Sequence, residues 1–238
     1  SVKEYFDALG QIHKRVENEY AIAQGQTGDV QVPLLKSSRA WFFDNGNEGR
    51  YKLTQTGYAY DAYGNVTEVE NLGEAGDSSD GHRVCTEYAY NTTDWIIGLP
   101  IRNWIEDESG RKVSETFLSY QGVDLIEKRL WNGGGDDLVF RYAYDAYGNQ
   151  THATDPLGRT TRAEYDPVFH AFPIKTVNPL GHVQRAIYDP LFGAAISVTD
   201  ANGATTRTAY DPFGRPSVVI GPNATESLPS TMYSYDLS

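Results

Sequence analysis

The sequence predicts an all-β fold built from consecutive antiparallel β-hairpins that wind as a spiral, solenoid-like sheet. Three observations predict it: short turn sequences recur at nearly constant spacing, the residues between them alternate with a period of two, and a tyrosine precedes every second turn. Turns at intervals of roughly 8–12 residues are typical of antiparallel all-β chains.

The turn sequence has the form Asp/Asn-x-x-Gly, with Pro or Ala at the second position. Asp or Asn can accept a hydrogen bond from the backbone amide two residues later. Pro presets φ for a type I turn. Gly readily adopts the positive φ that lets the chain turn back into the next strand of a bulged hairpin. The copies begin and end at Asp61 and Gly64, Asp145 and Gly148, Asp155 and Gly158, Asn178 and Gly181, Asp200 and Gly203, and Asp211 and Gly214. Asp7 begins a further copy, and Asp166 and Asp189 begin variants with one extra residue.

The spacing of the turns gives the strand length. Between residues 145 and 211 the turns start 10, 11, 12, 11, 11 and 11 residues apart. Four turn residues then leave roughly seven for each strand, or about 23 Å at ~3.3 Å per residue. In residues 159–165 and 204–210 every second side chain lies on the same face, and this period of two residues is typical of a β-strand. Each repeat therefore has two strands and two turns over about 22 residues.

Tyrosines mark one strand of each repeat. In Tyr-x-Tyr pairs such as Tyr142 and Tyr144 both rings share a face, so we expect successive hairpins to stack them into ladders. The repeat tyrosines are Tyr60, Tyr90, Tyr144, Tyr165, Tyr188, Tyr210 and Tyr235.

The chain is expected to be one continuous repeat array of uneven regularity. Residues 1–140 are interpreted as degenerate repeats with longer loops, and residues 141–238 as regular repeats. Gly73–Gly81 and Gly133–Asp137 are expected to be acidic, glycine-rich loops. In Ile12–Ala23 the apolar spacing is compatible with a helix, but a strand is favoured because the segment follows a turn sequence.

Composition excludes several classes of function. The net charge of −12 disfavours binding to nucleic acid or to an anionic membrane surface. No apolar run approaches the ~18 residues of a membrane span, and the single cysteine, Cys85, cannot form an intramolecular disulfide. The first residues do not form a signal peptide. Because the repeat pattern reaches both ends, we expect an excised part of a longer protein, with its targeting signal elsewhere.

No catalytic, metal or cofactor site is predicted. His152, His170 and His182 lack the short spacing of a metal-binding pair. The aspartates that could form a glycosidase pair are already explained as turn residues. Gly133–Asp137 occurs once and lacks the spacing of calcium-binding β-roll repeats. The chain is therefore expected not to be an enzyme.

Several segments resemble the Rhs/YD-repeat family. They are Tyr210-Asp211-Pro212-Phe213-Gly214-Arg215, residues 155–166 and 200–211, and Trp95-Ile96-Ile97-Gly98-Leu99-Pro100, which is similar to the Trp-Leu-x-Gly-x-Pro phrase of bacterial members. Those members include the B component of insecticidal toxin complexes and wall-associated YD proteins, and teneurins are distant relatives. The resemblance implies that the sheet is a fragment of a hollow shell, which in toxin members encloses a C-terminal toxin. The Asp-rich autoproteolytic motif of such shells is not visible.

Three functions follow as hypotheses. The first is a structural shell segment of a secreted or cell-surface bacterial protein that encapsulates a C-terminal toxin or effector. Its partners would be the remainder of the parent shell, the enclosed segment and, through open strand edges, further copies of the chain. The second is an adhesin or wall-associated module that binds glycan or protein through Gly73–Gly81 and Gly133–Asp137. The third, least favoured, is a carbohydrate-active enzyme using Asp136 and Asp137.

Overall fold

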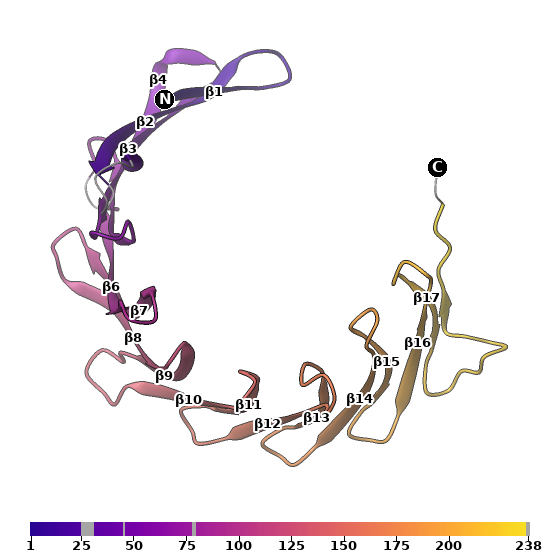
Figure 1. The fold of residues 1–238 in the computed structure, drawn as a ribbon. Coiled ribbons are helices and arrows are strands. Elements are labelled where there is room, and N and C mark those ends of the chain that lie inside the picture. Colours follow the sequence, from indigo (N-terminus) through magenta and orange to yellow (C-terminus); the bar gives the residue numbers. More distant parts are fainter. Residues whose placement is uncertain (25–30, 45, 78–79, 237–238) are drawn as a thin grey trace. The chain divides into compact units, whose positions relative to one another are not determined.

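The computed structural model describes residues 1–24, 31–44, 46–77 and 80–236 (Figure 1). Within these ranges it contains 18 β-strands and no helix, and the strands pair antiparallel with the strands that precede and follow them in the chain. The predicted all-β hairpin fold is confirmed. None of the described residues forms a helix that could span a membrane.

The chain divides into two compact units. The first contains residues 1–123 and 128–138, and the second contains residues 124–127 and 139–238. The strands of the first unit are β1 (Val2–Phe6), β2 (Ile12–Gln24), β3 (Gln31–Asp44), β4 (Asn47–Tyr60), β5 (Val66–Glu74), β6 (His82–Asn91), β7 (Ile96–Asp107) and β8 (Lys112–Gln121), and β9 (Asp124–Leu130) lies at the division. From β1 to β8 each strand pairs with the next.

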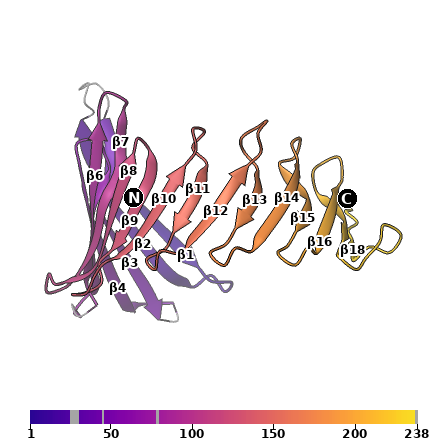
Figure 2. The ribbon, with the colours of Figure 1, turned by 90° about the horizontal axis from the view of Figure 1, so that it is seen from below.

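The second unit repeats one hairpin pattern. Its strands are β10 (Leu138–Tyr144), β11 (Gln150–Thr154), β12 (Thr160–Tyr165), β13 (Pro173–Val177), β14 (Val183–Asp189), β15 (Ala194–Thr199), β16 (Thr205–Tyr210), β17 (Pro216–Ile220) and β18 (Thr231–Met232). Each pairs with its successor from β10 to β18, and Figure 2 shows the hairpins of this unit following one another.

Strand length separates the units. In the second unit β10 to β17 have five to seven residues, near the seven expected from turn spacing. In the first unit β2, β3 and β4 have 13, 14 and 14 residues, so much of the extra length of these repeats lies in strands. The segment with competing helical spacing forms strand β2, as favoured. The expected loop at residues 73–81 begins inside β5, and residues 78 and 79 lie outside the described part.

Neither unit has a thick hydrophobic core. Among the described residues only Ile12, Cys85 and Glu115 are buried, with 8%, 6% and 5% of their surface exposed. No described side chain is fully enclosed. Since a strand presents alternate residues to opposite faces, a sheet without a covering layer leaves both faces in contact with solvent. Stability must then come from the strand ladders and from contacts between neighbouring hairpins.

Candidate functional site: the hairpin turns, the tyrosines and a charged face

The turn aspartates bind their own backbone. At Asp145, the carboxylate Oδ1 accepts hydrogen bonds from the amides of Tyr147 (2.9 Å) and Asn149 (3.0 Å). The amide of Gly148 donates to the carbonyl of Asp145 (3.2 Å), and Gly148 has a φ of 82°. The same bonds recur at Asp7, Asp61, Asp107, Asp155, Asn178, Asp200 and Asp211, each with glycine at positive φ three residues later. Sequence reasoning missed Asp107, although Asp107-Glu108-Ser109-Gly110 has the required pattern.

The residue after the turn glycine engages the second carboxylate oxygen. Arg111, Arg159 and Arg215 each donate from Nε to Oδ2 of their own turn aspartate, at 2.9, 2.6 and 2.7 Å. Asn65 and Asn149 donate from Nδ2 instead, at 2.8 and 3.0 Å. These contacts stabilise the charged carboxylate. At Asp107 the side chains of Ser109 and Arg111 lower its pKa to about 2.

The two variant turns differ from the rest. Asp166 accepts four backbone amides, from Val168 and Phe169 on Oδ1 and from Ala171 and Phe172 on Oδ2. Burial opposes ionisation of Asp166, but these four bonds outweigh it and lower its pKa. At Asp189, Oδ1 accepts from Leu191 at 2.8 Å.

The repeat tyrosines bind the main chain at a β-bulge. Tyr144 pairs with Gln150, and the register then skips Thr151. The ladder between β11 and β12 begins only at His152, so the carbonyl of Gln150 lies beyond it. The hydroxyl of Tyr165, in the next repeat, donates to that carbonyl at 3.3 Å. The tyrosine therefore supplies a hydrogen bond at the place where the ladder ends.

This arrangement recurs along the chain, and we call the donating tyrosines the tyrosine row. The further donor and acceptor pairs are Tyr60 to Leu35, Tyr88 to Val66, Tyr120 to Pro100, Tyr144 to Leu125, Tyr210 to Ala195 and Tyr235 to Pro216, at 2.8–3.1 Å. In the strand ladder, five of these acceptor residues pair with the tyrosine of the preceding repeat. The pairs are Leu35 with Tyr20, Val66 with Tyr60, Pro100 with Tyr88, Ala195 with Tyr188 and Pro216 with Tyr210. Each repeat with such a donor is thus bound to the one before it.

The tyrosine row differs from the sequence prediction in three respects. Tyr88, not Tyr90, donates to the bulge carbonyl, while Tyr90 donates to Asp61 Oδ2 at 2.7 Å. The hydroxyl of Tyr188 donates no such bond among the described residues, and its ring stacks on Phe172, with ring centroids 5.2 Å apart. No ring contact of the described residues joins repeat tyrosines of successive hairpins, so hydroxyl bonds and not stacked ladders link them. The spacing of tyrosines could not reveal this, because the acceptor is a backbone atom.

Two turns with the identical sequence Tyr-Asp-Ala-Tyr-Gly-Asn each bind a backbone carbonyl further along the chain. Asn149 Nδ2 donates to the carbonyl of His170 at 2.6 Å, and the ring of Tyr147 stacks on His170 with centroids 3.8 Å apart. In the other copy, Asn65 Nδ2 donates to the carbonyl of Ile97 at 2.6 Å. The bond from Tyr90 to Asp61 raises the pKa of Tyr90 to about 12.

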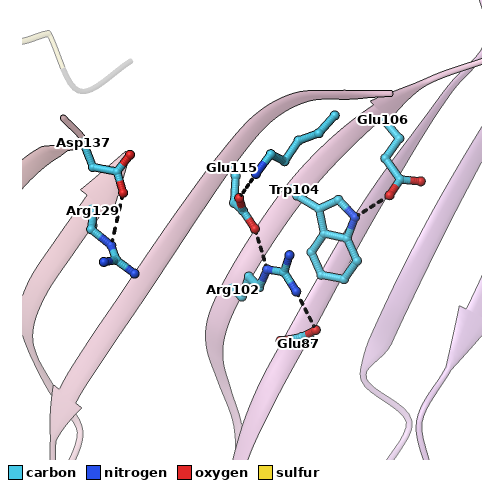
Figure 3. A network of polar contacts seen from close by, with 8 residues as sticks. Glu87, Arg102, Trp104, Glu106, Glu115, Arg129 and Asp137 are labelled. Carbon is cyan, nitrogen blue, oxygen red and sulfur yellow. Dashed lines mark hydrogen bonds and ion pairs between the residues drawn. The ribbon is translucent and has the colours of Figure 1, made fainter. Parts of the chain in front are cut away.

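One face of β6, β7 and β8 carries a network of charged and aromatic side chains (Figure 3). Glu115, whose side chain is 3% exposed, accepts from Arg102 Nε at 2.6 Å and from Lys112 Nζ. Arg102 also pairs with Glu87 at 3.1 Å and lies 4.4 Å from the centre of the Trp104 ring. Burial disfavours the charge of Glu115, but Lys112 and Arg102 outweigh it and lower its pKa. The network joins three strands without a hydrophobic layer.

The remaining candidate residues do not converge on one centre. Cys85 is buried, and burial followed by the charge of Glu68 raises its pKa, which makes it a poor nucleophile. Asp137 pairs with Arg129 at 3.5 Å. His152 and His182 contact the neighbouring side chains of Thr151 and Asn178. Among the described residues no three His, Cys, Asp or Glu side chains form a group that could hold a metal ion.

Solved structures have the same fold. The chain matches the crystal structure of TcdB2-TccC3 with a TM-score of 0.67 at 11% identity, over 90% of this chain and 16% of that chain. It matches the structure of the Photorhabdus luminescens Tc holotoxin pore with a mutation in TccC3 with a TM-score of 0.65 at 12% identity, over 90% and 15%. The chain thus spans less than a fifth of those chains. No curated protein matches its sequence.

A family model described as RHS Repeat matches residues 188–226. The matched segment begins at Tyr188 and includes Tyr210 and the turns that begin at Asp200 and Asp211. The turn and tyrosine contacts of this segment recur over both units of the structure. The chain therefore contains an RHS repeat at residues 188–226.

Proposed function

We propose that the chain is a structural wall segment of an Rhs-type shell. One observation carries the proposal: each unit is a single-layer sheet, and only Ile12, Cys85 and Glu115 of the described residues are buried. A free-standing domain of this length would bury a much larger core. A sheet that is stabilised by turns, strand ladders and the tyrosine row can cover a large area with a single layer of strands. That property suits the wall of a shell.

Exposed apolar side chains support a position inside a larger assembly. Ile187 and Phe169, which are 60% and 58% exposed, line the same apolar hollow of the second unit. A contiguous exposed apolar patch marks a surface that meets other protein. In the proposed role, that protein includes the remainder of the parent polypeptide, which continues the wall.

The finer part of the proposal concerns the contents and location of the shell. The wall would enclose a toxin or effector segment of the same polypeptide, and the assembly would act outside the producing cell. The likeness of the fold to part of the TcdB2-TccC3 chain supports this. We further propose that the segment is not catalytic, because its turn aspartates are occupied by their own backbone amides.

The proposal is tested by asking whether one face of the sheet is enclosed in the longest natural polypeptide that contains these residues. Gln184 and Arg185 are adjacent, exposed residues of β14, so their side chains point to opposite faces. Gln184→Cys and Arg185→Cys, each combined with Cys85→Ser, would be treated with a maleimide that carries a large polyethylene glycol chain.

A wall predicts that only one of the two thiols reacts in the intact polypeptide, and that both react in the 238-residue chain and after denaturation. Equal reaction of both thiols in the intact polypeptide would exclude an enclosed face. That result would favour the alternative of a surface-displayed adhesin, whose sheet has solvent on both sides.

A further inference from the structure

Three arginines in the second unit stand apart from the others. Arginine occupies the third position before the tyrosine in four successive repeats, at Arg141, Arg162, Arg185 and Arg207. Arg141 pairs with Glu127 at 3.3 Å. Within the described part of the chain, Arg162, Arg185 and Arg207 have no hydrogen bond, ion pair or aromatic contact, whereas every other arginine has a hydrogen bond or an ion pair. Unpaired cations at one repeat position, in a chain of net charge −12, call for an explanation.

The strand register places these arginines on one face. Arg162 pairs with Val177, and Lys175, two residues away, pairs with Arg185. Arg185 pairs with Thr199 in turn, and Ser197, two residues from it, pairs with Arg207. Paired residues, and residues two apart, share a face. The arginines therefore form a diagonal row. Each lies two strands, or about 9.6 Å, across the sheet and two residues, or about 6.6 Å, along the strand direction from the one before it, so their Cα atoms are about 12 Å apart.

An apolar hollow adjoins the middle of this row. It has a volume of about 630 Å³, and its lining includes Arg185, Ile187, Phe169, Phe172 and Tyr188. The ring of Phe172 stacks on Tyr188, and Phe169 meets Phe172 edge to face at 6.0 Å. Ile187 and Phe169 are 60% and 58% exposed. The hollow thus combines a free guanidinium with an uncovered aromatic and aliphatic floor.

We propose that this face binds an extended acidic peptide that carries one large apolar side chain. The carboxylates pair with Arg162, Arg185 and Arg207, and the apolar side chain enters the hollow. Side chains on one side of a β-strand recur every ~6.6 Å, so carboxylates four residues apart in an extended peptide lie about 13 Å apart, close to the spacing of the arginine row. The proposal goes beyond the wall role and does not depend on it.

The surrounding charge favours a peptide over a nucleic acid. Both ends of the strands carry turn aspartates, among them Asp155 and Asp200 at one end and Asp166, Asp189 and Asp211 at the other. The basic row is therefore a narrow band between two acidic rims. A duplex, which carries phosphates along its whole surface, would meet these rims as well as the arginines. A single extended peptide is narrow enough to avoid them.

Fluorescence anisotropy with a labelled, extended probe peptide tests the proposal. The probe has Glu at every fourth position and one central Phe. We expect saturable binding to the 238-residue chain that weakens with added salt. The variant carrying Arg162→Gln, Arg185→Gln and Arg207→Gln should bind at least about tenfold more weakly. Arg50→Gln, which removes an exposed arginine paired with Asp44, should leave affinity unchanged.

Matched probes and variants separate the two parts of the site. Phe169→Ala should weaken binding of the probe with Phe but not of a probe with Gly in its place, and Leu157→Ala, at an exposed turn outside the hollow, should have no effect. A probe with Gln in place of every Glu should bind more weakly. Equal affinity of the wild type and the triple arginine variant, with both folded by circular dichroism, would overturn the proposal. Preferential binding of an oligonucleotide or of dextran sulfate would also overturn it.

Discussion

Asp107 accepts hydrogen bonds from its own turn through both carboxylate oxygens, and these bonds hold its pKa at about 2. A carboxylate with this many local donors is ionised at neutral pH and is committed to its own turn. Asp155 and Asp211 have the same contacts, with backbone amides on Oδ1 and an arginine on Oδ2. At the scale of single residues, nine of the 32 Asp and Glu residues of the chain therefore stabilise hairpin turns.

Acid should weaken the fold through these carboxylates. Because the pKa of Asp107 is lowered from 3.8 to about 2, its stabilising contribution is complete above about pH 4 and is lost as the pH falls towards 2. Asp107→Asn should lower the midpoint of thermal unfolding at pH 7, and the difference from the wild type should shrink between pH 4 and pH 2. Circular dichroism melts across this range would measure it. Glu108→Gln, at the adjacent exposed residue, should retain the wild-type dependence.

The tyrosine hydroxyls should contribute measurably to stability. Tyr210→Phe removes the donor to the carbonyl of Ala195 and leaves a part-buried carbonyl without that bond. We expect a loss of about 1 kcal/mol in the free energy of unfolding, measured by urea denaturation. Tyr142→Phe is the matched control, because Tyr142 has no hydrogen bond among the described residues, and it should be nearly neutral. Equal losses in both variants would contradict a role for the hydroxyl.

Single residues also show how far sequence reasoning reaches. Turn residues could be predicted because Asp, Pro and Gly act through local geometry, and the structure places all six predicted turn pairs at hairpin turns. The choice of Tyr88 over Tyr90 could not be predicted, because it depends on the register of β6 against β5 and β7. The unpaired arginines were missed for a similar reason, although their fixed distance from the repeat tyrosines is visible in the sequence.

At the scale of the hairpin, the turn glycine fixes how one strand leads into the next. Gly148 has a φ of 82° and no atom within 4 Å of where a Cβ would lie, so an alanine there meets backbone strain alone. Gly148→Ala should destabilise the chain by about 1 kcal/mol. Gly57→Ala, in strand β4 with ordinary contacts to Glu70 at 3.9 Å, should instead stabilise it by roughly 0.5 kcal/mol. Thermal and urea unfolding would measure both, and the same sign for both variants would refute this account of the turn.

The charged network across β6, β7 and β8 should behave as a unit. Glu115→Gln removes the charge that holds Arg102 and Lys112, and we expect a loss of roughly 1–3 kcal/mol in the free energy of unfolding. Glu87→Gln affects a carboxylate that is 49% exposed, and should cost less than about 0.5 kcal/mol. Urea denaturation compares the two. Similar losses of stability in both variants would show that the burial of Glu115 does not strengthen its contribution to the free energy of unfolding.

Elements were predicted unevenly along the sequence. In the second unit, turn sequences lie close together and fix each strand from both ends. In the first unit β2, β3 and β4 are longer than the strands of the regular repeats, because cross-strand pairs such as Trp41 with Leu53 and Phe43 with Tyr51 extend the ladders. The Glu115 network was not predicted, since its members become neighbours only through strand pairing.

At the scale of the whole molecule, each repeat is stabilised mainly by the repeat beside it. Stability in such an array is the sum of local terms, so a local change should have a local effect. This distinguishes the chain from a domain with one core, in which a destabilising substitution is felt throughout. The proposed wall role depends on it, because a wall extended repeat by repeat needs no central core.

Hydrogen–deuterium exchange with mass spectrometry, comparing the wild type with Tyr210→Phe, tests this claim most directly. We predict faster exchange of the amides in β15, β16 and β17, where the hydroxyl bond of Tyr210 is lost, and unchanged exchange in β11 and β12 and in β2 to β4. A uniform acceleration across all strands would show that the chain unfolds as one cooperative core, and would contradict the account of a single-layer array of locally stabilised hairpins.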